Sequence, residues 1–350
     1  MNDNEKLLIW YKKNKRQLPW RNTQNPYYIW LSEIILQQTR VEQGLPYYLN
    51  FTNTFKTIFT LAEAPSETVL KLWQGLGYYS RARNMHKTAK NIVEQFGGVF
   101  PDKYEKLIKL KGIGPYTAAA IASFAYNQPY AVLDGNVFRV LARYFCIDKP
   151  INSTIGKKIF TQLANEFLNK KEPAIHNQAI MELGAIVCTP ANPKCTECPI
   201  QNGCLANTKK IQSTLPLKLT KKKPINRYFN YLVLVQNNKT YLKQRTLKDI
   251  WQGLFEPILI ETDNFTELPN ITEAFCKKFN IKPEKLMVLN SHQYKHQLTH
   301  QTIHAQFVTL AVKSKLKIED NLTCVYIKDV EKYPTHRLFE KYLQNVNLPF

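Results

Sequence analysis

LKGIGPYT, residues Leu110 to Thr117, says more about the fold of this 350-residue chain than any other segment, because it joins two helix-like segments through a Gly-x-Gly turn. Gly112 and Gly114 permit positive φ angles and a close approach of the backbone, and the proline that follows suits the first turn of a helix. Amide N–H groups exposed at such a turn can bind a phosphate oxygen, helped by the dipole of the next helix. A plain connection between two helices is the alternative interpretation.

Helix-like segments separated by Gly, Pro and Asn fill the chain up to about residue 205. The pattern predicts helices over residues 27–43, 66–76, 81–95, 104–110, 115–126, 137–145, 155–169 and 175–187. No alternating strand pattern occurs in this part. We therefore predict an all-α first domain at 1–205.

A basic segment at 206–227, which contains Pro216 and Pro224, is interpreted as an interdomain linker. Beyond it the apolar residues follow the period of strands, so a smaller α+β domain is predicted at 228–350. The pattern predicts strands at 228–236, 239–244, 257–261, 286–290, 303–312 and 323–327, and helices at 271–279 and 332–343.

The charge balance favours a polyanionic partner. The chain has 48 Lys and Arg residues against 27 Asp and Glu, a formal net charge of +21, and nucleic acid is the commonest partner of such a field. A lysine-rich surface that only keeps the protein solvated is the alternative. No apolar run approaches the roughly 20 residues that span a bilayer, and the charged first residues differ from a secretory segment, so we expect none. We expect a cytoplasmic, nucleoid-associated bacterial protein that contacts no membrane.

Four cysteines fall in one proline-containing loop with the spacing Cys188-x6-Cys195-x2-Cys198-x5-Cys204. Four thiolates this close together can surround one soft metal centre. Zinc sites usually place two close pairs far apart, whereas this loop has one close pair, so a [4Fe–4S] cluster fits better. Zinc and four unrelated buried thiols are the alternatives.

Two carboxyl groups stand out by their surroundings. Asp134 precedes the apolar helix at 137–145 and is a candidate cap, a position whose amide donors favour the charged carboxylate. Glu33 lies among Trp30 and Ile34, where burial of a charge is costly, so its pKa should be raised. A neutral carboxylic acid can donate a proton while a nearby ionised carboxylate stabilises positive charge, and enzymes assign these two roles to carboxyl groups in different environments. The alternatives are that Asp134 is only a helix cap and that Glu33 lies on the one solvent-facing side of an otherwise buried helix.

The cysteine spacing resembles the cluster loop of the helix-hairpin-helix DNA glycosylases related to endonuclease III. The motifs from about Leu18 to Cys204 are similar to the adenine-specific branch of that family, MutY. This resemblance implies a [4Fe–4S] cluster and a base excision repair enzyme that acts on double-stranded DNA as a monomer. The implied reaction is hydrolysis of the N-glycosidic bond of adenine mispaired with 8-oxoguanine or guanine.

The resemblance also implies roles for individual residues. Glu33 is then the general acid that protonates the leaving purine, Asp134 is the catalytic aspartate, and Asn136 helps to position water. Bifunctional relatives carry a lysine nucleophile where this chain has Tyr116, and a phenol cannot form a Schiff base. A monofunctional glycosylase is therefore predicted, with Tyr116 hydrogen-bonded near Asp134.

Extruding a base from a duplex requires side chains that fill the gap and hold the backbone. By resemblance, Gln38 and Tyr78 are the wedges, and Arg21 and Gln178 are neighbours of the flipped adenine. Further DNA contacts are expected from Arg81, Arg83, Gly112 and Gly114. Alternatively, the loops that carry Gln38 and Tyr78 have only polar surface residues and aromatic residues of the core.

The segment from Gln244 to Glu256 resembles the entry to a Nudix fold, but the helix predicted at 271–279 has only one glutamate, so no nucleotide hydrolysis is expected. The sequence HQLTH at 296–300 resembles the family loop that reads 8-oxoguanine, through Thr299 and His300. Leu298 stands where the family usually has Phe, which removes an aromatic stacking group. The four histidines in this region are also a minor candidate for a metal site.

Two other functions remain open at this point. One is an endonuclease III-like or thymine-mismatch glycosylase, which the extra C-terminal domain and Tyr116 disfavour. The other is a non-catalytic iron–sulfur module that only binds DNA, which would require Glu33 or Asp134 to be dispensable.

Overall fold

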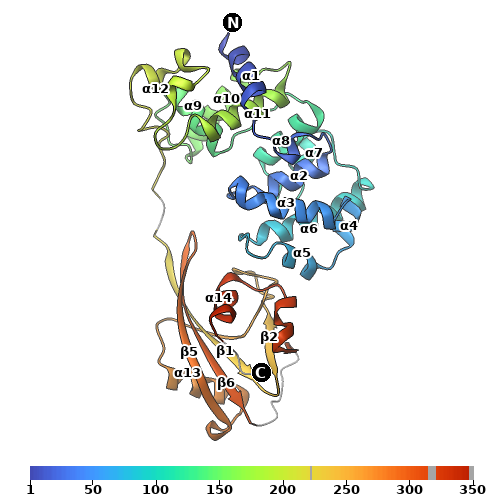
Figure 1. The fold of residues 1–350 in the computed structure, drawn as a ribbon, viewed down its shortest axis with the longest axis vertical. Coiled ribbons are helices and arrows are strands. Elements are labelled where there is room, and N and C mark those ends of the chain that lie inside the picture. The colour runs from blue at the N-terminus through green and yellow to red at the C-terminus, as the bar shows by residue number, and fades with distance from the viewer. Residues whose placement is uncertain (221–222, 314–320, 347–350) are drawn as a thin grey trace. The chain divides into compact units, whose positions relative to one another are not determined.

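The computed structural model describes residues 1–220, 223–313 and 321–346, and the chain divides into two units (Figure 1). The first unit comprises 1–63 and 84–220, and the second comprises 64–83 together with the described residues after 220. In the described parts of the chain, no helix has both the length and the apolar character that crossing a membrane requires.

The first unit is helical throughout, and its described residues include no strand, as the sequence predicted. Its α-helices are α1 (Asp3–Asn14), α2 (Pro26–Ile35), α3 (Val41–Thr54), α4 (Ile58–Glu63), most of α6 (Ser80–Phe96), α7 (Tyr104–Leu107), α8 (Pro115–Tyr126), α9 (Gly135–Tyr144), α10 (Thr154–Phe167), α11 (Pro173–Ile186) and α12 (Leu205–Thr208).

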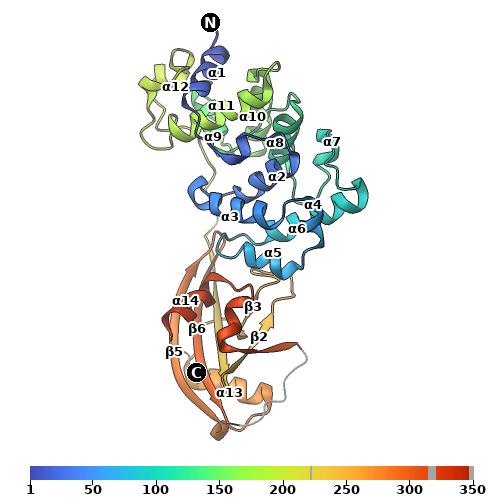
Figure 2. The same cartoon turned by 45° about the vertical axis from the view of Figure 1, so that its right-hand side comes forward.

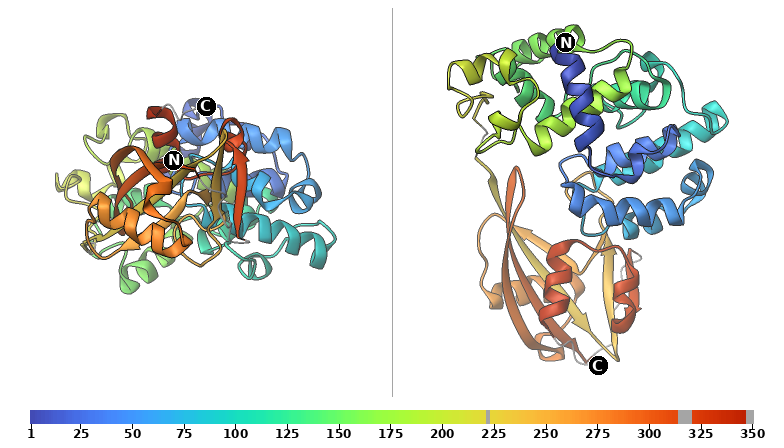
Figure 3. Two further views of the ribbon diagram at one scale, coloured as in Figure 1. Left: turned by 90° about the horizontal axis from the view of Figure 1, so that it is seen from below. Right: turned by 45° about the horizontal axis from the view of Figure 1, so that its top comes forward.

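The core of this unit forms where α8, α9 and α11 meet. Helix α8 is rich in alanine, and small side chains such as Ala120 let neighbouring helices approach closely. Leu141 of α9 and Leu183 of α11 are fully buried against it. Helix α1 lies across α11 (Figure 3). It contributes Leu7 and Tyr11 to the buried core.

The prediction of one helix at 27–43 is wrong, because two helices occupy that region. Helix α2 ends at Ile35, Gln38 has a left-handed φ of 55°, and α3 begins at Val41. A left-handed residue cannot continue a right-handed helix, so the chain turns there. Helices α1, α4 and α12 were not predicted, and α3 was predicted only at its start.

The described residues of the second unit form two sheets and three helices that belong wholly to it (Figure 2). One sheet has the order β4-β1-β6-β5, with β1 parallel to β6 and the other pairs antiparallel, and the other has the order β3-β2-β7. The strands are β1 (Ile225–Val235), β2 (Lys239–Gln244), β3 (Phe255–Glu256), β4 (Ile258–Thr262), β5 (Leu286–Gln297), β6 (Gln301–Val312) and β7 (Leu322–Tyr326). The helices are α5 (Ser66–Leu72), α13 (Leu268–Phe279) and α14 (Arg337–Asn345).

Alternate residues of β1 and β6 face the two long helices of the C-terminal part. Leu232 and Val308 belong to the cluster that buries Phe275 of α13. On the other face Phe307 stacks on Tyr231 and on Tyr342 of α14, with ring centroids 4.6 Å apart in both pairs. This alternation is the two-residue period of a strand, so the predicted α+β domain is confirmed.

Strand β5 is much longer than predicted. The prediction ended at residue 290, where the pairing with β6 has a bulge between Val288 and Asn290, but the strand continues to Gln297. The bulge interrupts the alternation that the sequence pattern relies on. As a result, residues 298–300 form the turn between β5 and β6 rather than part of a longer loop.

Candidate active site

One cavity of about 500 Å³ lies among α2, α8, α9 and α11 of the helical unit. Eight of the side chains or glycines predicted from the sequence line it: Arg21, Glu33, Gln38, Gly114, Tyr116, Asp134, Asn136 and Gln178. These residues are far apart in the chain, so the fold brings together most of the predicted catalytic and base-contacting set.

Glu33 is buried on α2 and points into this cavity, with 6% of the residue exposed. Burial raises its pKa to about 7, and the nearby carboxylate of Asp134 adds to the increase. Tyr116 opposes this shift, because its hydroxyl donates a 2.6 Å hydrogen bond to Glu33 Oε2. The predicted direction of the pKa shift is confirmed. The tyrosine lies near Asp134, as expected, and its hydroxyl bonds to Glu33.

Asp134 caps α9, as predicted. Its Oδ1 accepts from the backbone N–H groups of Asn136 at 2.9 Å and Val137 at 2.7 Å, and its Oδ2 accepts from the Asn136 side chain at 2.8 Å. The expectation that the cap would dominate its pKa is wrong. Burial raises the pKa of Asp134 above its ordinary value, and these donors only reduce that shift.

Asn136 also connects Asp134 to the start of the cysteine loop. Its Oδ1 accepts a 2.8 Å bond from Arg139 Nη2, and Arg139 Nε donates to the backbone carbonyl of Cys188 at 2.7 Å. Both residues lie in α9, so the position of the Asp134 carboxylate is tied to the neighbouring loop through a short series of hydrogen bonds.

The far wall of the cavity carries a charged group that the sequence analysis missed. Glu182 of α11 is fully buried and accepts from Arg16 Nη2 at 2.8 Å and Arg21 Nη2 at 2.6 Å. Burial alone would raise the pKa of Glu182, but these donors lower it to about 2. Glu182 lies one helical turn after Gln178, whose Oε1 accepts from the Tyr11 hydroxyl at 2.6 Å. That i, i+4 spacing places both side chains on one face of α11, but it does not indicate the arginine partners of Glu182.

Both predicted wedge residues have the same unusual backbone conformation. Gln38 has a φ of 55° and Tyr78 a φ of 47°, and both side chains are exposed. Non-glycine residues rarely adopt this region, and such positions concentrate at functional sites.

The Gly-x-Gly turn joins α7 to α8. Gly112 has a φ of +78°, and a Cβ there would approach the Asn84 side chain within 2.8 Å, so this position requires glycine. Gly114 is the N-cap residue of α8, and Pro115 is its first residue, as predicted.

The two arginines predicted to contact DNA, Arg81 and Arg83, make contacts within the second unit. Arg81 is buried, its guanidinium lies over the rings of Trp73 and Tyr78, and burial lowers its pKa to about 10. Arg83 Nη1 donates to the Gln252 carbonyl at 2.7 Å. Their described contacts are therefore with this unit's own residues.

The four cysteines of the predicted ligand set line one small cavity, of about 30 Å³, at the end of α11. Burial raises the pKa of Cys198 to about 12, and the thiols of Cys188, Cys195 and Cys204 add to the shift, so the four sulfurs influence one another. Arg143 of α9 donates to Cys188 Sγ at 3.3 Å. Among the described residues, no group of three or more His, Cys, Asp or Glu side chains is arranged to hold a metal ion.

Thr299 lies in the β5–β6 turn, and its Oγ1 is 2.7 Å from the Tyr78 hydroxyl. A cavity of about 490 Å³ is lined by Tyr78, Trp251, Leu298, Thr299 and His300. One of the two predicted wedge residues, Tyr78, therefore meets the predicted lesion-reading residues here, whereas Gln38 lines the 500 Å³ cavity. The histidines of this region make separate contacts: His304 stacks on Tyr228, and His296 lies beside Trp251.

Comparisons with known proteins agree with this fold. A family of HhH-GPD superfamily base excision DNA repair proteins matches residues 31–168, and the NUDIX domain matches residues 230–345. A structure of a thermostable thymine-DNA glycosylase is 28% identical with a TM-score of 0.55, and the match covers 59% of this chain and 95% of that chain.

Two curated relatives extend over nearly the whole sequence. An adenine DNA glycosylase of Buchnera aphidicola subsp. Baizongia pistaciae (strain Bp) is 37% identical over 323 residues, which cover 90% of this chain and 87% of that protein. Another, from Buchnera aphidicola subsp. Acyrthosiphon pisum (strain APS), is 35% identical over 345 residues, which cover 97% and 96%.

Proposed function

This chain belongs to the adenine DNA glycosylase family of base excision repair enzymes, and from that premise we propose that it excises adenine opposite 8-oxoguanine or guanine, as a monofunctional monomer. The observation that carries the proposal is the pair of carboxyl groups in the 500 Å³ cavity, Glu33 with a pKa of about 7 and Asp134 held by three N–H donors. The thymine-mismatch alternative has only a partial structural likeness in its favour, whereas the adenine-specific relatives span both domains.

The division of labour follows from the two environments. Glu33, protonated in part at neutral pH, transfers its proton to the adenine as the C–N glycosidic bond breaks and the bonding electrons leave with the base. The sugar becomes an oxocarbenium-like cation, which the Asp134 carboxylate stabilises. Water then adds to the sugar and returns a proton to Glu33. Asn136, bonded to Asp134 Oδ2, is positioned to orient that water.

A monofunctional reaction requires that no amine attacks the sugar. The described lining of the 500 Å³ cavity includes no lysine, and Tyr116 occupies the first turn of α8 with its hydroxyl committed to Glu33. A phenol cannot form a Schiff base, so release of the base by hydrolysis is the reaction that this lining supports.

The second cavity supports recognition of the base opposite the adenine. Thr299 and His300 lie beside Tyr78, and the threonine hydroxyl that already contacts Tyr78 can exchange that bond for one to the lesion. Leu298 provides no aromatic face, so in this proposal hydrogen bonding carries the discrimination. Gln38 and Tyr78 fill the gap left by the extruded base, and the turn from Gly112 to Gly114 holds a phosphate.

A [4Fe–4S] cluster is the cofactor that we propose for the cysteine loop. The donor set fits, because four thiols line one cavity and each iron of such a cluster takes a different thiolate, so the sulfurs need not converge on one point. When bound, the cluster supplies a rigid cross-link of the loop. Arg143 would donate to the Cys188 ligand.

Replacing Cys198 with Ser tests the cofactor proposal. We expect the purified variant to lose most of its iron content and its visible absorption, because one of four ligands is gone. Cys276, which lies in α13 of the other unit, provides the control: Cys276→Ser should keep the spectrum of the parent protein. An unchanged spectrum for Cys198→Ser would exclude this residue as a ligand.

The reaction itself is tested with labelled duplexes that contain A:8-oxoG, A:G or thymine glycol. We expect strand cleavage of the first two only after alkali, and no reaction of the third, because hydrolysis leaves an intact strand with an abasic site. Borohydride should trap little protein on DNA. Cleavage without alkali together with efficient trapping would mean that an amine attacks the sugar and would contradict the monofunctional proposal.

A further inference from the structure

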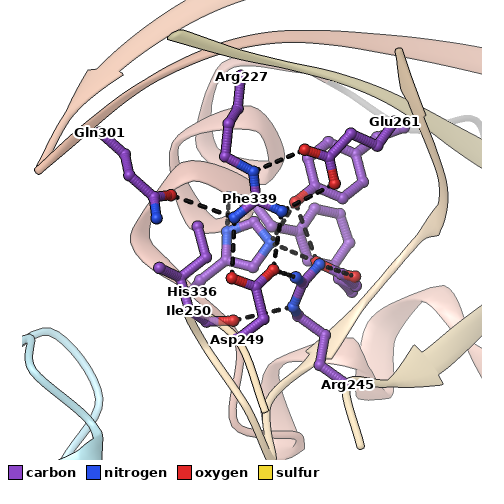
Figure 4. Close-up of polar contacts among 10 residues, drawn as sticks. Arg227, Arg245, Asp249, Ile250, Glu261, Gln301, His336 and Phe339 are labelled. Atoms are coloured by element: carbon purple, nitrogen blue, oxygen red, sulfur yellow. Dashed lines mark hydrogen bonds and ion pairs between the residues drawn. The ribbon is translucent and has the colours of Figure 1, made fainter. Parts of the chain in front are cut away.

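All five N–H donors of Arg227, on strand β1, have an acceptor. The guanidinium binds Asp249 through two bonds of 2.8 Å and Glu261 through bonds of 2.6 and 2.8 Å, and its Nη1 also donates to Gln301 Oε1 at 3.1 Å. Figure 4 shows this group between the three side chains. Its planar fork suits two bidentate carboxylates at once, which fixes its orientation.

Two of these acceptors, Asp249 and Gln301, line the 490 Å³ cavity, on opposite walls. Asp249 lies in the loop between β2 and β3, which also supplies Trp251 to the lining. Gln301 begins β6 and ends the turn that carries Thr299, and its carbonyl accepts from the Leu298 N–H at 2.8 Å. One side chain therefore spans from the Trp251 loop to the Thr299 turn.

The wall formed by the Trp251 loop is also stabilised by buried residues of the domain. Arg245 donates to Asp249 Oδ2 at 2.6 Å and to the buried Glu256 at 2.7 Å, and Glu256 accepts from the Tyr231 hydroxyl at 3.0 Å. Among the described residues, no second arginine donates a hydrogen bond to the turn wall. Within that set, Arg227 is the guanidinium that links the turn to the loop.

We propose that Arg227 is a positioning residue that sets the distance between the Trp251 loop and the Thr299 turn, and thereby the fit of the base opposite the adenine. The inference rests on the proposed reading of that base by Thr299. Arg227 does not itself line the cavity, so its effect passes through Asp249 and Gln301.

The test measures single-turnover excision from A:8-oxoG and from A:G duplexes, and compares the ratio of the two rate constants. Arg227→Lys keeps the charge but cannot make two bidentate pairs, so we expect the ratio to fall by about tenfold, because a small displacement of a recognition group is costly. Gln301→Ala removes only the fifth contact and should lower the ratio less. Arg337→Lys, which alters a single exposed pair with Glu340, is the matched control and should leave it unchanged.

Combination with Thr299→Ala separates positioning from general stability. If Arg227 acts through the turn, the double variant should show the ratio of Thr299→Ala alone. An unchanged ratio in both Arg227→Lys and Gln301→Ala would overturn the inference, as would an equal loss on both duplexes. A parent protein without preference for A:8-oxoG would instead contradict the proposed function, and the inference with it.

Discussion

Replacing Glu33 with Gln is expected to lower the single-turnover rate of adenine excision by about a thousandfold, the size of a general-acid contribution. The amide keeps the shape of the side chain and can still accept the hydrogen bond from Tyr116, but it has no proton to transfer. Binding to an A:8-oxoG duplex should be retained. A variant that excises adenine at the parent rate would exclude Glu33 as the acid.

The pH dependence of the excision rate of the parent enzyme is a second test of Glu33 as the general acid. The acid works only while protonated, and its pKa is raised to about 7. The excision rate should therefore fall as the pH rises through about 7. The Glu33→Gln variant should lack this decline, since its amide does not titrate.

A surface pair provides the matched control for Glu33. Tyr130 donates to Glu105 Oε1 at 2.8 Å, the same tyrosine–glutamate contact, but here the glutamate is exposed and the tyrosine is half-buried. Glu105→Gln should leave the rate and its pH profile unchanged. A comparable loss there would mean that any disturbed tyrosine–glutamate pair slows the enzyme.

Replacing Asp134 with Asn should lower the excision rate by about a hundredfold to a thousandfold, because the developing sugar cation loses its counter-charge. Asparagine is itself a good helix cap, so α9 should remain folded. Because burial raises the pKa of Asp134, the parent rate should also decline on the acid side, as the carboxylate takes up a proton. The measurement is the single-turnover rate between acid and neutral pH.

The control for Asp134 removes a cap that lies outside the cavity. Ser153 caps α10, and its Oγ accepts from the Gly156 N–H at 2.9 Å. Ser153→Ala should cost about 1 kcal/mol of unfolding free energy and leave excision unchanged. If Asp134→Asn lost only stability and kept the parent rate, its role would be the cap alone.

Features that depend on neighbours in the sequence were predictable from the chain itself. The helix pair around Gly112, the cap at Asp134 and the cysteine loop all appear where their local patterns placed them. Glycine conformations, caps and ligand spacing act within a few residues, so composition and spacing carry the necessary information. The α+β pattern after residue 228 was visible for the same reason.

Features that depend on burial and on distant partners were visible only after folding. Tyr116 bonds to Glu33 across 83 positions of the chain, and no local pattern indicates which of two carboxyl groups it will reach. The cap at Asp134 is a local property, but the main effect on its pKa is burial by the residues packed around it, which raises the pKa. The Glu182 and Arg227 ion-pair groups likewise depend on where helices and strands meet, because electrostatic energies follow distance and solvent access in space rather than order along the chain.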